Sequence, residues 1–317
     1  MEHRYTLAAF DVGGSKIEAL VFTEQGNILA RVRDKGGNPL EMGLERAAEH
    51  YANVISRAIA ASGARQIDAL YGGVAATEYF GDGLKKLLSE HLPFVRRIRI
   101  EGDGCAIISG MLGHRDGACM ISGTGSSVYV RQGDDYYHLG GWGHLIDTCG
   151  SGFMLGRLAI QAACRAYDGI AEPTLLSELL EKQCGQPIWE HFISIYHGER
   201  PYIASFAGTV FEARRLGDRV ATRIFNECAA DLANIAHAAA RRIGKPFDLV
   251  LNGGIFASFP EYAEAVKALC PAGVNVIRSD VPVVYGGAVE AMYDVGLVCD
   301  ESFKKTILAE FRAIIIS

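Results

Sequence analysis

The chain of 317 residues lacks several features that would assign it to a specialised class of protein. No apolar run approaches the ~20 residues that a membrane-spanning helix requires. No long run of lysine or arginine occurs and the net charge is −6, so neither a nucleic acid nor a membrane surface is an expected partner. The residues before the first apolar run show no signal-peptide pattern, and we therefore expect a cytoplasmic protein.

Paired cysteines are also missing. The 8 cysteines are scattered along the chain, none forms a CxxC pair, and several lie in apolar runs. This distribution is typical of free, partly buried thiols in a reducing compartment, and it disfavours disulfides or a metal site. The remaining composition, 49% apolar and 21% charged, is that of an ordinary globular protein long enough for two domains.

Apolar runs of strand length alternate with amphipathic runs of helix length along the chain. The first part predicts strands over 6–12, 17–22, 28–34, 67–74 and 95–101, with helices over 40–61, 83–90 and 104–112. The second part predicts strands over 118–122, 127–131, 136–139, 247–252 and 274–278, with helices over 152–166, 174–182, 202–215, 219–242, 260–269, 286–293 and 301–316. Both parts open with three strands around glycine-rich turns. The pattern predicts two α/β lobes and an internal duplication, with a boundary near residue 115 and no flexible linker.

Two glycine-rich turns each lie between two apolar runs, as in a β-hairpin. The first is Asp11–Lys16 (DVGGSK) and the second is Ser122–Ser126 (SGTGS). A turn without side-chain bulk allows backbone N–H groups to point at an anion. We predict that both turns bind the phosphates of one nucleotide. Lys16 could add charge against phosphate or could be a solvated strand residue.

Two aspartates occupy positions where carboxylates carry chemistry. Asp11 ends the first strand, where it could hold a hydrated Mg²⁺ beside phosphate oxygens or simply cap the hairpin. Asp103 lies between a strand and a helix, where it could orient and deprotonate an attacking hydroxyl. The simpler interpretation of Asp103 is a helix N-cap.

Two further glycine-rich segments are candidates for ligand contact. Gly140–His144 (GGWGH) offers backbone amides and the flat face of a tryptophan, which suit a sugar, unless the tryptophan packs into the core. Asn252–Gly254 ends an apolar strand, and its paired glycines allow either the close approach of a flat ring or a tight turn.

Together these motifs resemble the sugar kinases of the actin/Hsp70/hexokinase superfamily, and among them the N-acetylglucosamine kinase group, also called the BadF/BadG/BcrA/BcrD ATPase-like family. Residues 121–127 are similar to its second phosphate motif, 102–104 to its first connecting segment, 251–254 to its adenosine motif and 285–291 to its second connecting helix. The resemblance implies two actin-like (ribonuclease H-like) lobes with an interlobe cleft. Residues 1–115 would form the sugar-side lobe, and residues 116–317 the lobe with a helical insertion and the adenosine site, with the last helix returning to the first lobe.

The resemblance also implies ligands and site residues. The expected activity is ATP-dependent, Mg²⁺-assisted phosphorylation of a hexose or amino sugar, at the 6-hydroxyl of N-acetylglucosamine, glucosamine or a related sugar, by a homodimer. Residues near the nucleotide would be Gly13, Gly14, Ser15, Lys16, Gly123, Thr124, Gly125, Ala207, Gly253 and Gly254. Residues near the sugar would be Asn38, Ser126, Ser127, Gly141, Trp142, Gly143 and Thr148, with Asp103 holding the reacting hydroxyl and Asp11 serving the metal.

One departure from the family pattern bears on the substrate. Thr148 and Cys149 stand where relatives carry an acidic pair, and Asp147 lies one position before it. A carboxylate that accepts two sugar hydroxyls is a strong determinant of specificity. The identity of the sugar, and whether Asp147 compensates, stay open. A non-catalytic sugar or nucleotide sensor is the alternative function. An ATPase that activates a dehydratase through an iron–sulfur cluster is a third, which the scattered cysteines disfavour.

Overall fold

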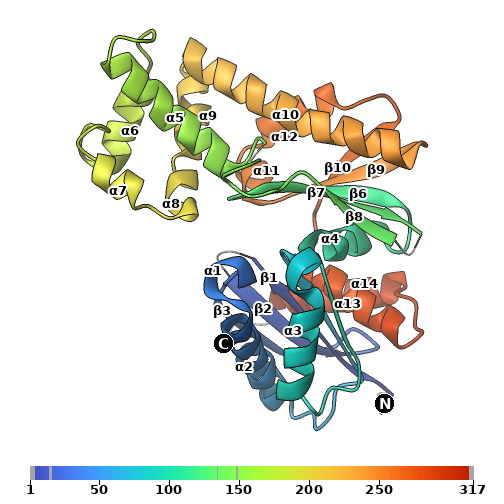
Figure 1. The fold of residues 1–317 in the computed structure, drawn as a ribbon. Coiled ribbons are helices and arrows are strands. Elements are labelled where there is room, and N and C mark those ends of the chain that lie inside the picture. Colours follow the sequence, from blue (N-terminus) through green and yellow to red (C-terminus); the bar gives the residue numbers. More distant parts are fainter. Residues whose placement is uncertain (1–3, 14–15, 134, 148, 314–317) are drawn as a thin grey trace. The chain divides into compact units, whose positions relative to one another are not determined.

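The computed structural model describes residues 4–13, 16–133, 135–147 and 149–313. The chain forms two compact units (Figure 1). The first comprises residues 1–116, 133–135 and 279–317, and the second comprises residues 117–132 and 136–278. Each unit contains one five-stranded mixed sheet with flanking helices, which confirms the predicted α/β class.

The sheet of the first unit has the strand order β3-β2-β1-β4-β5. Its strands are β1 (Thr6–Val12), β2 (Lys16–Thr23), β3 (Ile28–Lys35), β4 (Ala69–Val74) and β5 (Ile98–Glu101). Its helices are α1 (Pro39–Met42), α2 (Leu44–Ser62), α3 (Thr77–His91), α4 (Asp103–Leu112), α13 (Val283–Asp294) and α14 (Glu301–Ala313). The first three strands are antiparallel, and β4 and β5 run parallel to β1.

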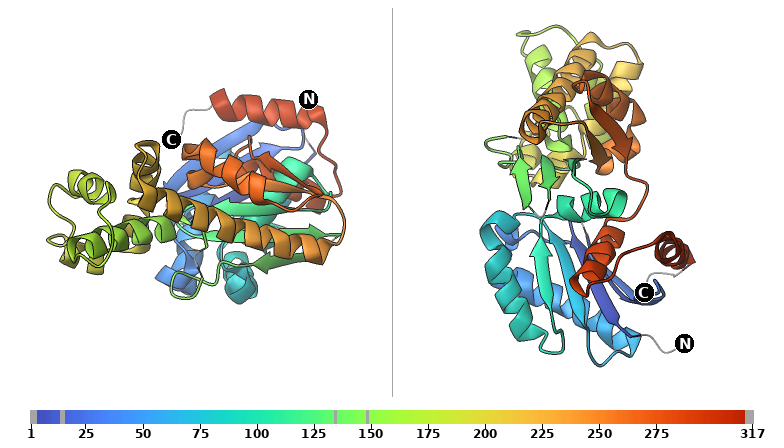
Figure 2. Two further views of the ribbon diagram at one scale, coloured as in Figure 1. Left: turned by 90° about the horizontal axis from the view of Figure 1, so that it is seen from above. Right: turned by 90° about the vertical axis from the view of Figure 1, so that its right-hand side faces the viewer.

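The sheet of the second unit has the order β10-β9-β6-β7-β8, which is the same plan as in the first unit. Its strands are β6 (Gly117–Ser122), β7 (Ser126–Gln132), β8 (Asp135–Leu139), β9 (Phe247–Asn252) and β10 (Val274–Arg278). Its helices are α5 (Gly152–Tyr167), α6 (Leu176–Cys184), α7 (Phe192–Tyr196), α8 (Arg200–Ala204), α9 (Ala207–Arg215), α10 (Arg219–Ile243), α11 (Gly254–Ser258) and α12 (Pro260–Leu269). Helix α10 lies over this sheet (Figure 2). The shared strand order confirms the predicted repetition.

Helices cover both faces of the first sheet, which explains why β1 reads as an almost unbroken apolar run. Phe10 and Val12 face the core under α2 and α3, whereas Leu7 and Ala9 face the core under α13 and α14. Figure 2 shows α13 and α14 on one side of this sheet. Asp11 therefore interrupts the apolar run on a face that is otherwise packed against α13.

Three predicted helices differ in extent from the observed ones. The predicted helix 40–61 is divided at Gly43, whose φ of +84° lies outside the right-handed helical region. The predicted helix 202–215 is divided at Phe206, whose N–H donates to Ile203 only three residues earlier. The helix predicted over 83–90 already begins after Ala76, which has a left-handed φ of +64°.

Helices α4 and α13 pack in direct backbone contact. A methyl group at Gly286 would lie 2.6 Å from the carbonyl carbon of Ala106 and 3.0 Å from the amide nitrogen of Gly110. Glycine at this crossing is therefore required by space and not by backbone conformation. Among the described residues, no helix is both long and apolar enough to cross a bilayer. The cysteines are free thiols, three of them buried, as predicted.

Candidate functional site

The first candidate site lies at the carboxyl ends of β1 and β4. Asp11 pairs in register with Gly73 of β4, and Asp103 is the first residue of α4, directly after β5. A methyl group at Gly73 would lie 3.7 Å from Oδ1 of Asp11 and 3.5 Å from Cα of Asp103. Both aspartates therefore lie beside Gly73 at the carboxyl ends of parallel neighbouring strands, although they are far apart in the sequence.

The local structure of Asp103 bears on its alternative interpretation as a helix cap. The N-cap position is occupied by Gly102, and Asp103 is already helical. Its Oδ1 accepts a hydrogen bond of 3.0 Å from the N–H of Gly104. One carboxylate oxygen thus contacts the helix terminus, an arrangement that holds the side chain in a defined position at the first turn of α4.

The electrostatics of this site centre on Asp11, which is 9% exposed. Burial and the neighbouring charge of Asp103 raise the pKa of Asp11 from 3.8 to about 7. Beside it on β2, Glu18 is buried as well, but Arg33, Lys16 and Arg31 surround it. Burial acts to raise the pKa of Glu18, and hydrogen bonds from Arg33 and Arg31 together with the charge of Lys16 outweigh it, so that this pKa is lowered.

Lys16 begins β2, and its side chain is half exposed. Its ammonium group lies 3.4 Å from Oε2 of Glu18. Lys16 therefore belongs to the same ion-pair cluster around Glu18 as Arg31 and Arg33. The carbonyl of Lys16 accepts a hydrogen bond of 2.9 Å from the N–H of Gly13, which closes the first glycine-rich turn. Gly14 and Ser15, also predicted to bind phosphate, lie outside the described residues.

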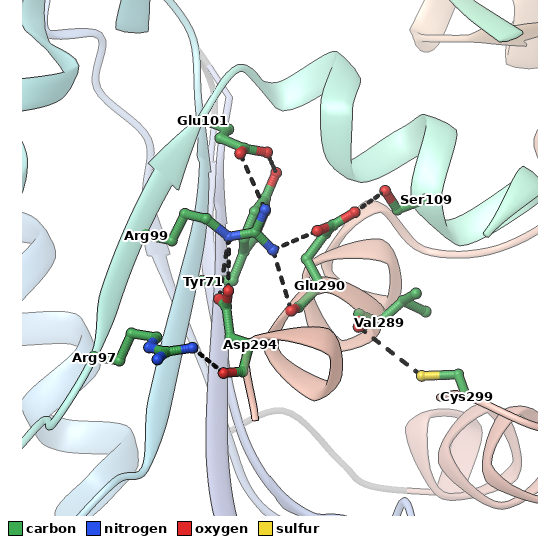
Figure 3. Close-up of polar contacts among 9 residues, drawn as sticks. All are labelled: Tyr71, Arg97, Arg99, Glu101, Ser109, Val289, Glu290, Asp294 and Cys299. Atoms are coloured by element: carbon green, nitrogen blue, oxygen red, sulfur yellow. Dashed lines mark hydrogen bonds and ion pairs between the residues drawn. The ribbon is translucent and has the colours of Figure 1, made fainter. Parts of the chain in front are cut away.

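An ion-pair network supports the junction between β5 and α4 (Figure 3). Arg99 contacts Glu101, Glu290 and Asp294, and the distances to Glu101 and Asp294 are both 3.1 Å. Glu290, which is fully buried on α13, also accepts a hydrogen bond from Ser109 of α4. The network therefore ties α13 to the strand before Asp103 and to the helix after it.

The second candidate site is the turn Ser122–Ser126 between β6 and β7. The N–H groups of Gly152 and Phe153, at the start of α5, donate to the carbonyl oxygens of Gly123 and Thr124 at 2.8 and 3.1 Å. In a trans peptide the N–H points opposite to the carbonyl, so the N–H groups of Thr124 and Gly125 point away from α5. The turn therefore directs two backbone donors away from α5, an arrangement that can bind an anion.

The segment Asn252–Gly254 lies directly against this turn. A methyl group at Gly253 would lie 2.6 Å from the carbonyl carbon of Ser122, and a methyl group at Gly123 would lie 3.9 Å from the amide nitrogen of Gly254. Gly253 has a φ of +110°, a conformation that side chains rarely adopt, so both sterics and backbone require glycine here. The structure thus brings together two motifs that the sequence places far apart.

The loop Gly140–Cys149 packs beside β7. A methyl group at Gly141 would lie 2.9 Å from Cβ of Ser127, so two of the predicted sugar-side residues are neighbours. Trp142 is 64% exposed, which contradicts the alternative in which it packs into the core. Gly143 begins a turn in which its carbonyl accepts from the N–H of Asp147 at 2.8 Å.

Asp147 forms hydrogen bonds within this loop. Its Oδ2 accepts from the N–H of Gly141 at 3.1 Å, and its Oδ1 accepts from the Cys149 thiol at 2.8 Å. Burial and Asp147 raise the pKa of Cys149 to about 12, which keeps the thiol protonated as a donor. The carboxylate therefore determines the shape of the loop. Thr148 lies outside the described residues.

Three other predicted residues have clear structural roles. Asn38 caps α1, because its Oδ1 accepts from the N–H of Leu40 at 2.9 Å. Ser126 donates from its hydroxyl to the carbonyl of Cys149 and so joins the second turn to the loop. Ala207 is buried in the core of the second unit.

Two functional candidates were not predicted from the sequence. Glu290 is an acidic residue in the interior of the largely apolar helix α13, and that contrast is the sequence signal for it. Arg200 is different, because nothing in its local sequence connects it with Gly125. A methyl group at Gly125 would nevertheless lie 3.1 Å from Nη2 of Arg200.

Comparison with known proteins agrees with this geometry. The sequence matches the BadF/BadG/BcrA/BcrD ATPase family over residues 10–291, and the chain belongs to this family. It is 32% identical over 148 residues to the N-acetylmuramic acid/N-acetylglucosamine kinase of Clostridium acetobutylicum, an alignment that covers 44% of this chain and only about half of that protein, 47%. It is 26% identical over 241 residues to the glucosamine kinase GspK of Vibrio cholerae, covering 74% of this chain and 81% of that protein.

Among solved structures, a Chromobacterium violaceum protein provisionally described as an N-acetylglucosamine kinase has a similar fold. Its TM-score is 0.73 at 19% sequence identity, and the superposition covers 89% of this chain and 97% of that chain. The likeness confirms the predicted fold.

Proposed function

We propose that this protein transfers the terminal phosphoryl group of ATP to a hydroxyl of a hexose or amino sugar, the 6-hydroxyl of N-acetylglucosamine, glucosamine or a related sugar. The observation that carries the proposal is the placement of Asp103 beside Asp11 across Gly73. Family membership and the kinase names of two relatives support it. The first unit would be the sugar-side domain and the second unit the adenosine-side domain; residues 279–317, expected in the second domain, belong to the first unit.

Asp103 is the proposed catalytic base. Phosphoryl transfer requires that the attacking hydroxyl be oriented and that its proton be accepted as the new bond forms. Its carboxylate is held at the start of α4 by the Gly104 N–H, and the α4 backbone is held in turn by Glu290 through Ser109. The side chain is therefore positioned before substrate binds, which reduces the entropic part of the barrier.

Asp11 suits a hydrated Mg²⁺ that accompanies ATP. It supplies a hard oxygen ligand. Burial and repulsion from Asp103 raise its pKa, and a divalent cation would relieve that repulsion. Within the described residues no cluster of three or more acidic, cysteine or histidine side chains forms a metal cage, so waters and phosphate oxygens would complete the coordination. When bound, the ion would neutralise charge on the phosphates.

The second unit offers the proposed phosphate and adenosine contacts. The N–H groups of Thr124 and Gly125 are the phosphate donors, and Gly254, beside which no atom lies where a side chain would be, leaves room for a flat ring close to the backbone. On the sugar side, Trp142 offers an exposed apolar face and the Gly141–Gly143 backbone offers polar groups. Because Asp147 holds the loop together, we propose that it shapes this surface and that the backbone makes the sugar contacts.

A coupled assay of ADP release tests the activity. The purified protein is supplied with ATP and Mg²⁺ and, in turn, glucose, glucosamine, N-acetylglucosamine, N-acetylmannosamine or N-acetylmuramic acid. We expect sugar-dependent ADP release with at least one of them. Nucleotide binding by calorimetry without ADP release for any sugar would support the sensor alternative instead.

The Asp103→Asn variant tests the mechanism. The amide keeps the size of the side chain but cannot accept the proton, so we expect kcat to fall by about 10²-fold or more with unchanged ATP affinity. Full activity in this variant would remove Asp103 from the mechanism. We also propose that the protein forms a homodimer in the cytoplasm. Light scattering would measure the mass of the particle in solution and so test the dimer.

A further inference from the structure

Arg200 lies against the second glycine-rich turn, although it belongs to a different part of the chain. Its Nη2 is 3.1 Å from the position that a methyl group at Gly125 would take. The φ of Gly125 is not in the left-handed region, so its backbone conformation would accept alanine. A side chain at Gly125 would therefore crowd the guanidinium of Arg200, which lies directly beside the turn.

Packing on α5 fixes the position of Arg200. Arg200 begins α8, whose Ile203 is buried against α5, where a methyl group at Gly156 would lie 3.1 Å from the carbonyl carbon of Ile203. The hydroxyl of Tyr202 bonds His191 and holds the other side of this short helix. The same helix α5 binds the carbonyl groups of the turn through its first N–H groups. One helix therefore positions both the turn and the arginine.

The chemistry of the turn indicates what this cation does. The five residues Ser122–Ser126 carry no ionisable side chain, and the N–H groups of Thr124 and Gly125 point away from α5. A guanidinium adds full positive charge and several donors in a planar arrangement, which suits phosphate oxygens better than backbone amides alone. We propose that Arg200 binds the phosphate chain of the nucleotide that this turn holds, an inference that rests on the proposed kinase function.

Calorimetry with three ligands tests the role of Arg200. The full-length protein and its Arg200→Met variant are titrated with ADP, with a non-hydrolysable ATP analogue and with adenosine. Loss of charge-assisted hydrogen bonds is expected to weaken binding of the two phosphorylated ligands by about 10- to 100-fold and to leave adenosine binding unchanged. Arg200→Lys keeps the charge without the planar fork and should retain part of the affinity. Arg223→Met, which removes an exposed arginine of α10, is the matched control and should change nothing.

A purely structural role gives different results. Arg200 would then only pin the start of α8 to the turn, and Arg200→Met would lower the melting temperature while ADP binds as tightly as to the wild type. That outcome overturns the proposal. Arg200→Lys provides the same comparison if the methionine variant does not fold.

Gly125→Ala tests the contact itself. Its methyl group would lie 3.1 Å from the guanidinium and force it to shift slightly, so the substitution should weaken ADP binding in the wild type and have little effect beside Arg200→Met. Equal effects in both backgrounds would contradict the contact. Should the wild type bind ADP well but phosphorylate no sugar, the kinase proposal fails and the Arg200 proposal stands. Should it bind ADP no better than adenosine, Arg200 has no phosphate to bind and this inference fails.

Discussion

Replacing Asp11 by asparagine should stabilise the protein at neutral and alkaline pH while it removes a proposed metal ligand. In the folded chain burial and Asp103 raise the pKa of Asp11 from 3.8 to about 7. Between these values the folded state retains a proton that the unfolded state has released, so the free energy of unfolding falls as pH rises. The stability due to the protonated carboxyl is complete below about pH 4 and is lost by about pH 7.

The size of the effect follows from the pKa difference. Each pH unit within that window should remove about 1.4 kcal/mol of stability, which amounts to about 4 kcal/mol over the whole shift. Asparagine keeps the shape of the side chain and does not titrate. The free energy of unfolding of Asp11→Asn should therefore lack this decrease with pH. We therefore compare the free energies of unfolding of Asp11→Asn and the wild type, in EDTA and without nucleotide. The advantage of the variant should grow by about 3 kcal/mol between pH 5 and pH 8.

Urea unfolding at several pH values measures this difference. Both tryptophans, Trp142 and Trp189, belong to the second unit, so their fluorescence follows that unit, whereas circular dichroism follows both. The effect should appear in the circular dichroism transition. Asp34→Asn is the control. A hydrogen bond from the N–H of Lys35 and the Arg57 side chain lower the pKa of Asp34. The difference in free energy of unfolding between Asp34→Asn and the wild type should therefore stay constant between pH 5 and pH 8. A constant difference for Asp11→Asn as well would refute the view that Asp11 is an uncompensated buried carboxyl.

Three further predictions concern the support of the site. Gly286→Ala should destabilise the protein by about 1–3 kcal/mol in urea unfolding, because α4 and α13 leave no space between them for a methyl group. Gly81→Ala on α3 is the control: its methyl group would have its nearest neighbour at 3.6 Å, so it should be neutral or stabilising by up to about 1 kcal/mol. Glu290→Gln should lower the free energy of unfolding by about 2 kcal/mol and reduce kcat more than it raises KM. An unchanged kcat would argue against the view that Glu290 holds α4 in place for catalysis. Ala76→Gly should raise the unfolding midpoint, by about 0.5–1 kcal/mol in free energy, because it relieves the left-handed conformation; an unchanged midpoint would argue against strain at this position.

The sequence alone predicted much of the secondary structure and the repeated plan. The apolar run of β1 indicated a strand, and the paired glycines at Gly13 and Gly253 indicated turns without side-chain bulk. These features are local, because strand burial and turn conformation depend on residues that are neighbours in the chain. The motif order was sufficient to indicate the family, which the match over residues 10–291 establishes.

Only the tertiary structure decided which side chains work together. Asp11 and Asp103 are neighbours because β1, β4 and β5 run parallel and end at the same edge of the sheet, and Glu290 supports α4 because α13 returns to the first sheet from the end of the chain. Arg200 reaches the second turn because Gly156 allows α8 to pack closely on α5. The reason is the same in each case. A buried charge or a close backbone approach depends on partners supplied by distant segments, and local sequence patterns carry no information about those partners.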